Sequence, residues 1–144
     1  MDARAALREL EALGTAQNRK VYARHGVLGP SFGVSYADLG NLKKRIGTDH
    51  LLALELWKSG NHDARMLATM VADPARLDRK TVESWAKNLA NYVLTDAVAA
   101  AVATSPCAVE VARAWIDAKS EWQSSVGWNL IARGAEPPER YGRR

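Results

Sequence analysis

The sequence predicts an all-α protein in which short helices pack as an array of antiparallel pairs. Apolar residues recur at intervals of three and four, as at Val82, Trp85 and Leu89, which is helical spacing. Residues that start helices and glycines that end them alternate along the chain. No segment shows the sustained apolar–polar alternation of a half-buried strand. These three observations argue against a sheet.

The helix boundaries follow from this alternation. Side chains that can accept hydrogen bonds from the free amides of a first helical turn mark the starts. These residues are Thr15, Ser35, Thr48, Asn61 and Asp78. Glycine tolerates the left-handed backbone of a helix end, and the glycines so placed are Gly14, Gly26, Gly47, Gly60 and Gly134. The predicted helices are 2–13, 15–25, 35–46, 48–59, 61–72, 78–90, 91–104, 106–119 and 120–133.

Short connections predict that consecutive helices are antiparallel neighbours, in pairs over 35–59, 61–90 and 91–119. The recurrence of two short helices favours an array, in which each pair buries its flank only against its neighbours. A compact bundle is the alternative. The single long connection, 26–34, follows no strand and lacks the Lys-Ser/Thr of a phosphate-binding loop. We therefore interpret it as a connector.

Length and composition fit one globular domain, expected over residues 1–135, with a polar tail over 136–144. Of the 144 residues, 47% are hydrophobic and 25% charged, which excludes wholesale disorder. The longest apolar run, between Asp96 and Thr104, is shorter than the roughly 20 residues of a membrane span. The chain starts without an apolar signal core, and Cys107 is its only cysteine. We therefore expect a reducing, cytoplasmic location.

A metal site and a reactive thiol receive little support. His25, His50 and His62 lie on three different predicted helices, without the spacing of metal ligands. Cys107 is expected to be a buried, unreactive thiol. The tryptophans are expected mainly in the core; they are Trp57, Trp85, Trp115, Trp122 and Trp128.

Positive charge is concentrated near the front of the chain. Lysine and arginine total 20 against 16 acidic residues, and residues 15–50 carry the whole surplus of +4. One interpretation is a surface that binds a polyanion, because such surfaces need clustered cations. The other is an ordinary solvated helix face.

The predicted helix 91–104 carries the strongest candidate for chemistry. Its apolar stripe consists of Leu94, Ala97, Val98, Ala101 and Val102. Tyr92 and Asp96, four residues apart, lie together on the opposite side. Alanines flank this pair and leave room for a large partner. The alternative is a solvated aspartate beside a half-buried tyrosine.

Several motifs between Thr15 and about Trp128 resemble one known family. They are Gln17-Asn18-Arg19-Lys20-Val21-Tyr22, Gly33-Val34-Ser35-Tyr36, Leu56-Trp57, Asn61-His62-Asp63-Ala64-Arg65, and Asn91-Tyr92 through Asp96. Together they resemble the bacterial DNA alkylation repair enzymes, the AlkD-type alkylpurine DNA glycosylases with HEAT-like helical repeats. The resemblance implies a HEAT-like or armadillo-type right-handed superhelix that binds duplex DNA on a concave basic face.

The resemblance also implies an activity and its residues. Family members excise purines that carry a positive charge after alkylation at N3 or N7, without a cofactor and, we expect, as monomers. Asp96 corresponds to the catalytic aspartate, which stabilises the cationic sugar, and Tyr92 to an aromatic that packs on the deoxyribose. From clustering, the expected DNA contacts are Arg19, Lys20, Arg24, Lys43, Lys44 and Arg65.

Three departures from the family pattern leave other functions open. Tyr92 stands where the glycosylases usually have tryptophan. They carry an arginine just after a tryptophan on a later helix, whereas the comparable stretch Trp122-Gln123-Ser124-Ser125-Val126 has none, and a further aromatic comes from repeats beyond residue 144. The tail 136–144 is therefore expected to be the truncation point of a longer array. The alternatives are a non-catalytic DNA-binding relative and a helical-repeat scaffold for protein interactions.

Overall fold

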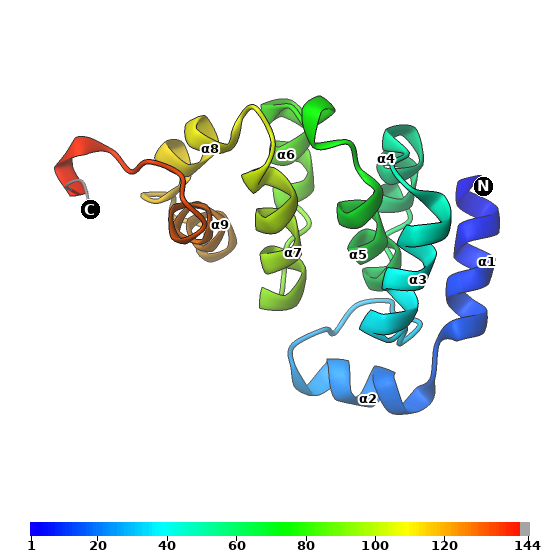
Figure 1. Ribbon diagram of the computed structural model, residues 1–144. Coiled ribbons are helices and arrows are strands. Elements are labelled where there is room, and N and C mark those ends of the chain that lie inside the picture. The colour runs from blue at the N-terminus through cyan, green and yellow to red at the C-terminus, as the bar shows by residue number, and fades with distance from the viewer. Residues whose placement is uncertain (142–144) are drawn as a thin grey trace. The chain divides into compact units, whose positions relative to one another are not determined.

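The computed structural model describes residues 1–141, which contain helices and no strands (Figure 1). The elements are α1 (Ala3–Leu13), α2 (Ala16–Arg24), α3 (Tyr36–Ile46), α4 (His50–Lys58), α5 (His62–Val71), η1 (Pro74–Arg76), α6 (Arg79–Ala86), α7 (Tyr92–Ala103), α8 (Ala108–Trp115), α9 (Glu121–Ala132) and η2 (Glu139–Tyr141). Each predicted segment contains one of the α-helices, so the all-α class is confirmed. No helix in the described range is long and apolar enough to cross a membrane.

Most predicted helix starts are confirmed at atomic detail. Thr15, Ser35, Asn61 and Asp78 each accept a hydrogen bond from the amide three residues further on, at 2.8 to 3.1 Å. The prediction for Thr48 is wrong. Asp49 caps α4 instead, because its carboxylate accepts from the Leu52 amide at 3.1 Å.

Four of the five predicted helix-ending glycines have a left-handed backbone, namely Gly26, Gly47, Gly60 and Gly134. Gly14 ends α1 as predicted, but the predicted left-handed conformation is wrong, because its backbone is extended, with φ −68° and ψ 148°. Glycine is needed at this position because the Cβ atom of any other residue would lie 2.0 Å from the carbonyl oxygen of Phe32. The connection 26–34 therefore passes directly over the end of α1.

Contacts divide the chain into two compact units, Met1–Asp73 and the part from Pro74 onward. In the first unit α4 packs most extensively on α5, and α3 also packs on α5. In the second unit α7 and α8 both pack on α9. The predicted pairs joined α3 with α4, α5 with α6, and α7 with α8. The structure instead packs α4 on α5 and α8 on α9, so this pairing is wrong. Helix starts and ends are marked by local residues, which do not tell which flanks of the helices fit together.

Asp63, at the start of α5, holds the long connection 26–34 in place. The side chain is 1% exposed, and its Oδ2 atom accepts hydrogen bonds from Ser31 Oγ at 2.9 Å, the Phe32 amide at 2.6 Å and the Gly33 amide at 3.1 Å. Its Oδ1 atom accepts from the Val34 amide at 3.0 Å. A buried carboxylate is tolerated when its oxygens are saturated by donors in this way.

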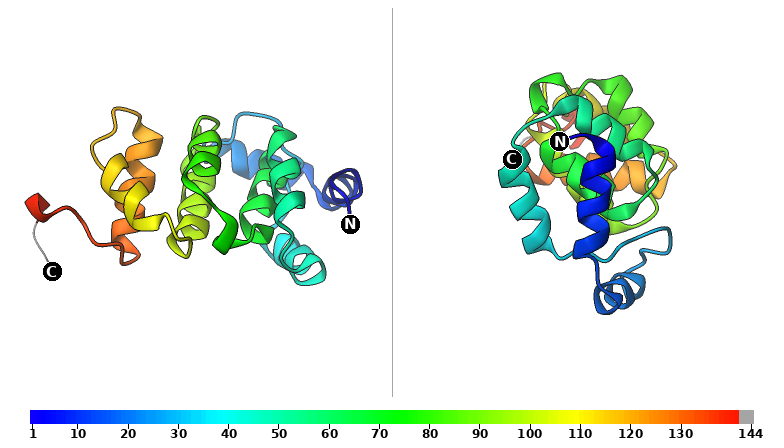
Figure 2. Two further views of the ribbon diagram at one scale, coloured as in Figure 1. Left: turned by 90° about the horizontal axis from the view of Figure 1, so that it is seen from above. Right: turned by 90° about the vertical axis from the view of Figure 1, so that its right-hand side faces the viewer.

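The connection in turn holds α2, which lies outside the stack of α3, α4 and α5 where α3 begins (Figures 1 and 2). None of the nine residues of α2 is buried. Polar contacts position the helix: the Asn18 side-chain amide donates to the Gly33 carbonyl at 3.0 Å, and the Tyr22 hydroxyl donates to the Val34 carbonyl. The position of α2 therefore depends on Asp63 through residues 31–34.

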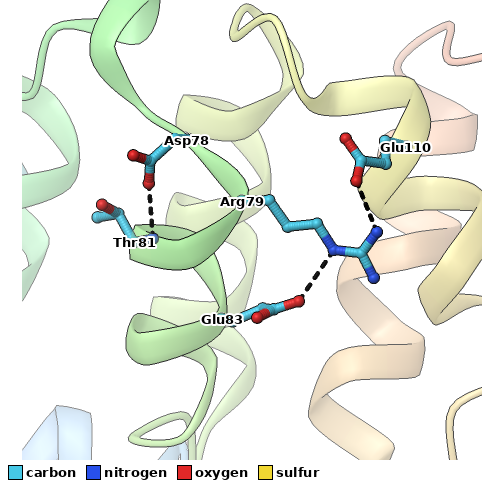
Figure 3. Close-up of polar contacts among 5 residues, drawn as sticks. All are labelled: Asp78, Arg79, Thr81, Glu83 and Glu110. Atoms are coloured by element: carbon cyan, nitrogen blue, oxygen red, sulfur yellow. Dashed lines mark hydrogen bonds and ion pairs between the residues drawn. The ribbon is translucent and has the colours of Figure 1, made fainter.

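The second unit combines an apolar core with a polar tie between helices. Its most deeply buried residues include Leu77, Val82, Val98, Val102, Val111 and Leu130. At the surface, Arg79 links α6 to α8, donating to Glu83 at 2.9 Å and to Glu110 at 2.7 Å (Figure 3). Asp78 caps α6 in the same view through the Thr81 amide.

The tryptophans divide between core and surface. Trp57, Trp85 and Trp115 are buried, as predicted for core residues. Trp122 is half-buried and Trp128 is 41% exposed, so the prediction is wrong for these two. Both lie on α9, whose contacts with α7 and α8 leave part of its surface open to solvent.

Replacing Asp63 with alanine should destabilise the first unit by about 3 kcal/mol, because buried amides lose their acceptor. Urea unfolding measures the free energy. Hydrogen exchange of the amides of Phe32, Gly33 and Val34 should accelerate at the same time. Glu55→Gln, at an exposed position on α4, is the matched control and should change stability by less than about 0.5 kcal/mol. Unchanged exchange in Asp63→Ala would contradict the role assigned to Asp63.

Two glycine-to-alanine substitutions should have opposite effects. At Gly127 in α9, a Cβ atom would lie 2.8 Å from the Ile116 amide nitrogen, so Gly127→Ala should cost about 2 kcal/mol by separating α8 from α9. At Gly40 in α3 a Cβ atom meets nothing within 4 Å, so Gly40→Ala should stabilise by up to about 1 kcal/mol. Thermal unfolding of both variants checks the signs; the same sign for both would be a failure of this account.

Candidate functional site

Helix α7 presents Tyr92 and Asp96 to solvent, one turn apart. The helix starts at Asn91, which accepts from the Leu94 amide at 2.8 Å. Its buried side is formed by Leu94, Thr95, Val98, Ala99 and Val102, while the predicted stripe members Ala97 and Ala101 are half-buried. Tyr92 is 54% exposed and Asp96 is exposed. The predicted solvent orientation of this pair is therefore confirmed.

Helix α9 adds an aromatic and a carboxylate beside Tyr92. The ring of Trp122 meets that of Tyr92 edge to face, with centroids 4.8 Å apart and an interplanar angle of 69°. The Glu121 carboxylate raises the pKa of Tyr92 through its negative charge, helped by desolvation of the tyrosine and a hydrogen bond to its hydroxyl. The phenol therefore stays neutral, and part of its ring is open to a ligand.

The side-chain amide of Asn129, on α9, connects Asp96 to Arg133. Asn129 Nδ2 donates to Asp96 Oδ1 at 2.8 Å, and Asn129 Oδ1 accepts from Arg133 Nε at 2.8 Å. We call Asp96, Asn129 and Arg133 the α7–α9 relay. The sequence pattern does not predict Asn129 or Arg133. Their spacing of four residues places them on one helix face, but nothing local relates that face to Asp96.

The chemistry open to Asp96 depends on what covers it. Among residues 1–141 no cation pairs directly with its carboxylate, so it can stabilise positive charge that develops nearby. In bulk water such stabilisation is weak, and it becomes large only where a ligand excludes water. The site therefore suits a large ligand that packs over Tyr92 and Asp96.

Three of the six predicted DNA-contacting cations come together on α2. Arg19, Lys20 and Arg24 are all exposed, and no acidic residue lies on the helix. Arg19 Nη1 donates to the Phe32 carbonyl at 3.1 Å. Within residues 1–141, the side chains of Lys20 and Arg24 have no hydrogen-bond or ion-pair partner. We call Arg19, Lys20 and Arg24 the α2 cations.

The other three predicted cations belong to other helices than α2. Lys43 and Lys44 are in the last turn of α3, at the opposite end from the connection that holds α2, and Lys43 Nζ donates to the Gly47 carbonyl at 3.0 Å. Arg65 donates to the Trp57 carbonyl at 3.1 Å and stacks over the Trp57 ring, 5.2 Å from its centroid. Burial lowers the pKa of Arg65. Its guanidinium thus serves a contact within the fold.

The His-acid-x-Arg motif has a packing role in this structure. His62 is 7% exposed, and its ring lies against that of Tyr22 with centroids 6.0 Å apart. Burial lowers the pKa of His62, which favours the neutral ring, although Asp63 opposes this shift. Burial also raises the pKa of Tyr22, and the Asp63 charge adds to this. Asp63, the acid of the motif, is the residue that holds the connection 26–34.

His50, His62 and Cys107 have structural surroundings in the described part of the chain. No group of three or more His, Cys, Asp or Glu side chains there is placed to hold a metal ion. His50 Nδ1 accepts from the Asp73 amide at 3.2 Å. Cys107 is buried, as predicted, with its sulfur 3.3 Å from Ser105 Oγ.

Comparisons with known proteins agree with this arrangement of helices. Residues 6–139 match the family model described as "DNA alkylation repair enzyme". The curated proteins Lin0241 of Listeria innocua and Lmo0209 of Listeria monocytogenes, both named uncharacterized, are each 28% identical over 133 residues. Each alignment covers 86% of this chain and 58% of the relative. The chain thus spans little more than half the length of these relatives.

A solved structure gives a closer match, with a TM-score of 0.86 and 34% sequence identity. The alignment covers 91% of this chain and 56% of the other. That protein is described within "a new family of proteins related to the HEAT-like repeat DNA glycosylases with affinity for branched DNA structures". The predicted HEAT-like fold is confirmed, and the chain belongs to the DNA alkylation repair enzyme family.

Proposed function

We propose that this protein binds double-helical DNA and prefers branched arrangements of duplex arms. Membership of the DNA alkylation repair family and the branched-DNA affinity of the structural neighbour support this proposal. The observation that carries it is the exposed set of α2 cations on a helix without acidic residues. Lysine and arginine bind phosphates without reading base sequence.

The way α2 is held favours binding to DNA. A long cation normally loses conformational freedom when it contacts a phosphate, and a fixed backbone reduces that cost. Asp63 fixes the connection 31–34, which fixes α2 through Asn18 and Tyr22. Lys20 and Arg24 consequently project from a backbone that is already in place.

Removing Lys20 and Arg24 should weaken DNA binding in a salt-dependent way. In the double variant Lys20→Ala/Arg24→Ala, the slope of log affinity against log salt should fall in magnitude by about 2, because each lost phosphate contact removes about 1. Fluorescence anisotropy with a labelled four-way junction and a linear duplex of equal length measures this. The parent protein should bind the junction more tightly.

The matched control is Lys58→Ala/Lys87→Ala, which removes the same charge from exposed positions on other helices. An equal loss of slope in both double variants would contradict the assignment to α2. Weak binding that salt does not affect, in the parent itself, would instead indicate a scaffold for protein interactions.

A second candidate function is hydrolysis of the N-glycosidic bond of purines alkylated at N3 or N7. The observation that favours it is the exposure of Tyr92 and Asp96 one turn apart on α7. In this reaction the bond between the base and C1′ breaks, and its electron pair leaves with the purine and neutralises its positive charge. Asp96 stabilises the cationic sugar, and water adds to C1′ and releases a proton. The products are free base and an abasic site.

Asp96→Asn should distinguish an enzyme from a DNA-binding protein without catalysis. With methylated DNA as substrate, release of alkylated base by the parent should fall at least about 100-fold in the variant, because the stabilising charge is lost. DNA affinity should hold or rise, because a carboxylate near phosphates is removed. Chromatography of the released bases gives the readout. A parent that binds junctions and releases no base refutes hydrolysis and leaves the proposed DNA binding intact.

A further inference from the structure

We infer that Arg133 is a DNA phosphate ligand of the second unit, held beside Asp96 by Asn129. The inference rests on the proposed DNA binding and names a contact that charge clustering does not predict. It concerns binding, and it holds whether or not Asp96 is catalytic.

Asn129 is suited to join a carboxylate to a guanidinium without letting them touch. A side-chain amide has both donors and an acceptor, so it satisfies the two groups at once. Its nitrogen donates to Asp96 Oδ1 and its oxygen accepts from Arg133 Nε, both at 2.8 Å. The opposite orientation of the amide would set its oxygen against the carboxylate, so only one orientation fits.

This linkage leaves the outer edge of the Arg133 guanidinium open. Arg133 is exposed, and within residues 1–141 its Nη1 and Nη2 atoms have no hydrogen-bond partner. Three arginines of the described chain are instead bound to carboxylates: Arg79 to Glu83 and Glu110 (Figure 3), Arg45 to Glu9, and Arg140 to Asp117. A guanidinium edge with two free nitrogens fits phosphate in bidentate fashion.

The carboxylates of Asp96 and Glu121 oppose the approach of DNA, and a nearby cation offsets this repulsion. Asp96 and Glu121 are both exposed beside Tyr92, and their carboxylates repel phosphates. Arg133 follows α9 directly and supplies positive charge next to Asp96. Arg133, the residue that ends α9, therefore reduces the repulsion between these carboxylates and DNA phosphates.

Arg133→Gln tests the assignment against a matched control in the same unit. The control is Arg113→Gln, which removes one charge from an exposed arginine on α8 whose Nε donates to the Glu136 carbonyl. With the labelled junction, Arg133→Gln should weaken binding about 10-fold and lower the magnitude of the salt slope by about 1. Arg113→Gln should leave the slope unchanged. Thermal unfolding verifies that both variants fold.

Asn129→Ala tests positioning, because it keeps every charge. Without the amide, Arg133 can pair directly with Asp96, so binding should weaken although the arginine is present. Combined with Arg133→Gln, the substitution should cause no further loss, which is the non-additivity expected of coupled residues. Arg133→Lys should keep the salt slope and lose part of the affinity, because lysine lacks the planar fork.

The outcomes separate the inference from the function on which it rests. If the parent binds no DNA, the proposed function fails and the inference fails with it. If the parent binds the junction but Arg133→Gln and Arg113→Gln behave alike, the inference is wrong and DNA binding stands. Additive losses in the Asn129 and Arg133 variants would likewise overturn the positioning role of Asn129.

Discussion

The arrangement of the first unit depends on the hydrogen bonds that the buried Asp63 carboxylate accepts. Helix α2 fully buries none of its residues, so apolar packing contributes less to its position than in the other helices of the unit. It is held by polar contacts with residues 31–34, and these residues are held by Asp63. One side chain on α5 thus decides where a basic helix lies, through backbone amides. In this unit the apolar core stabilises the fold, and the buried Asp63 carboxylate fixes the position of α2.

The sequence predicts the α-helices found within residues 1–141 because most of their boundaries have a local cause. A capping side chain or a left-handed glycine acts within a few residues of the end it marks. Most errors in the predicted fold arise from contacts between segments that are far apart in the sequence. Gly14 is explained by Phe32, which comes from another segment, and the pairing of helices depends on which flanks fit together. Thr48 is a local error, in which the neighbouring Asp49 is the stronger acceptor.

The candidate site likewise has residues that local sequence predicts and residues that only the packing of helices brings together. Helical periodicity is sufficient to place Tyr92 and Asp96 on the solvent side of α7, because that orientation follows from α7 alone. The relay cannot be predicted from local pattern, because Asn129 is 33 residues from Asp96 and meets it only when α7 packs on α9. Asp63 is visible as part of a motif, but the donors it serves come from a connection about 30 residues earlier.

A helix held mainly by polar contacts also differs from the core in its thermodynamics. When α2 detaches, little apolar surface meets water, so the heat capacity and the denaturant dependence of that step are small. Unfolding of the core formed by Leu10, Leu56 and Leu67 exposes far more apolar surface and responds steeply to both. We therefore expect the basic helix to open locally at a lower cost in free energy than the core of its unit. Any ligand that binds the α2 cations suppresses this opening by mass action.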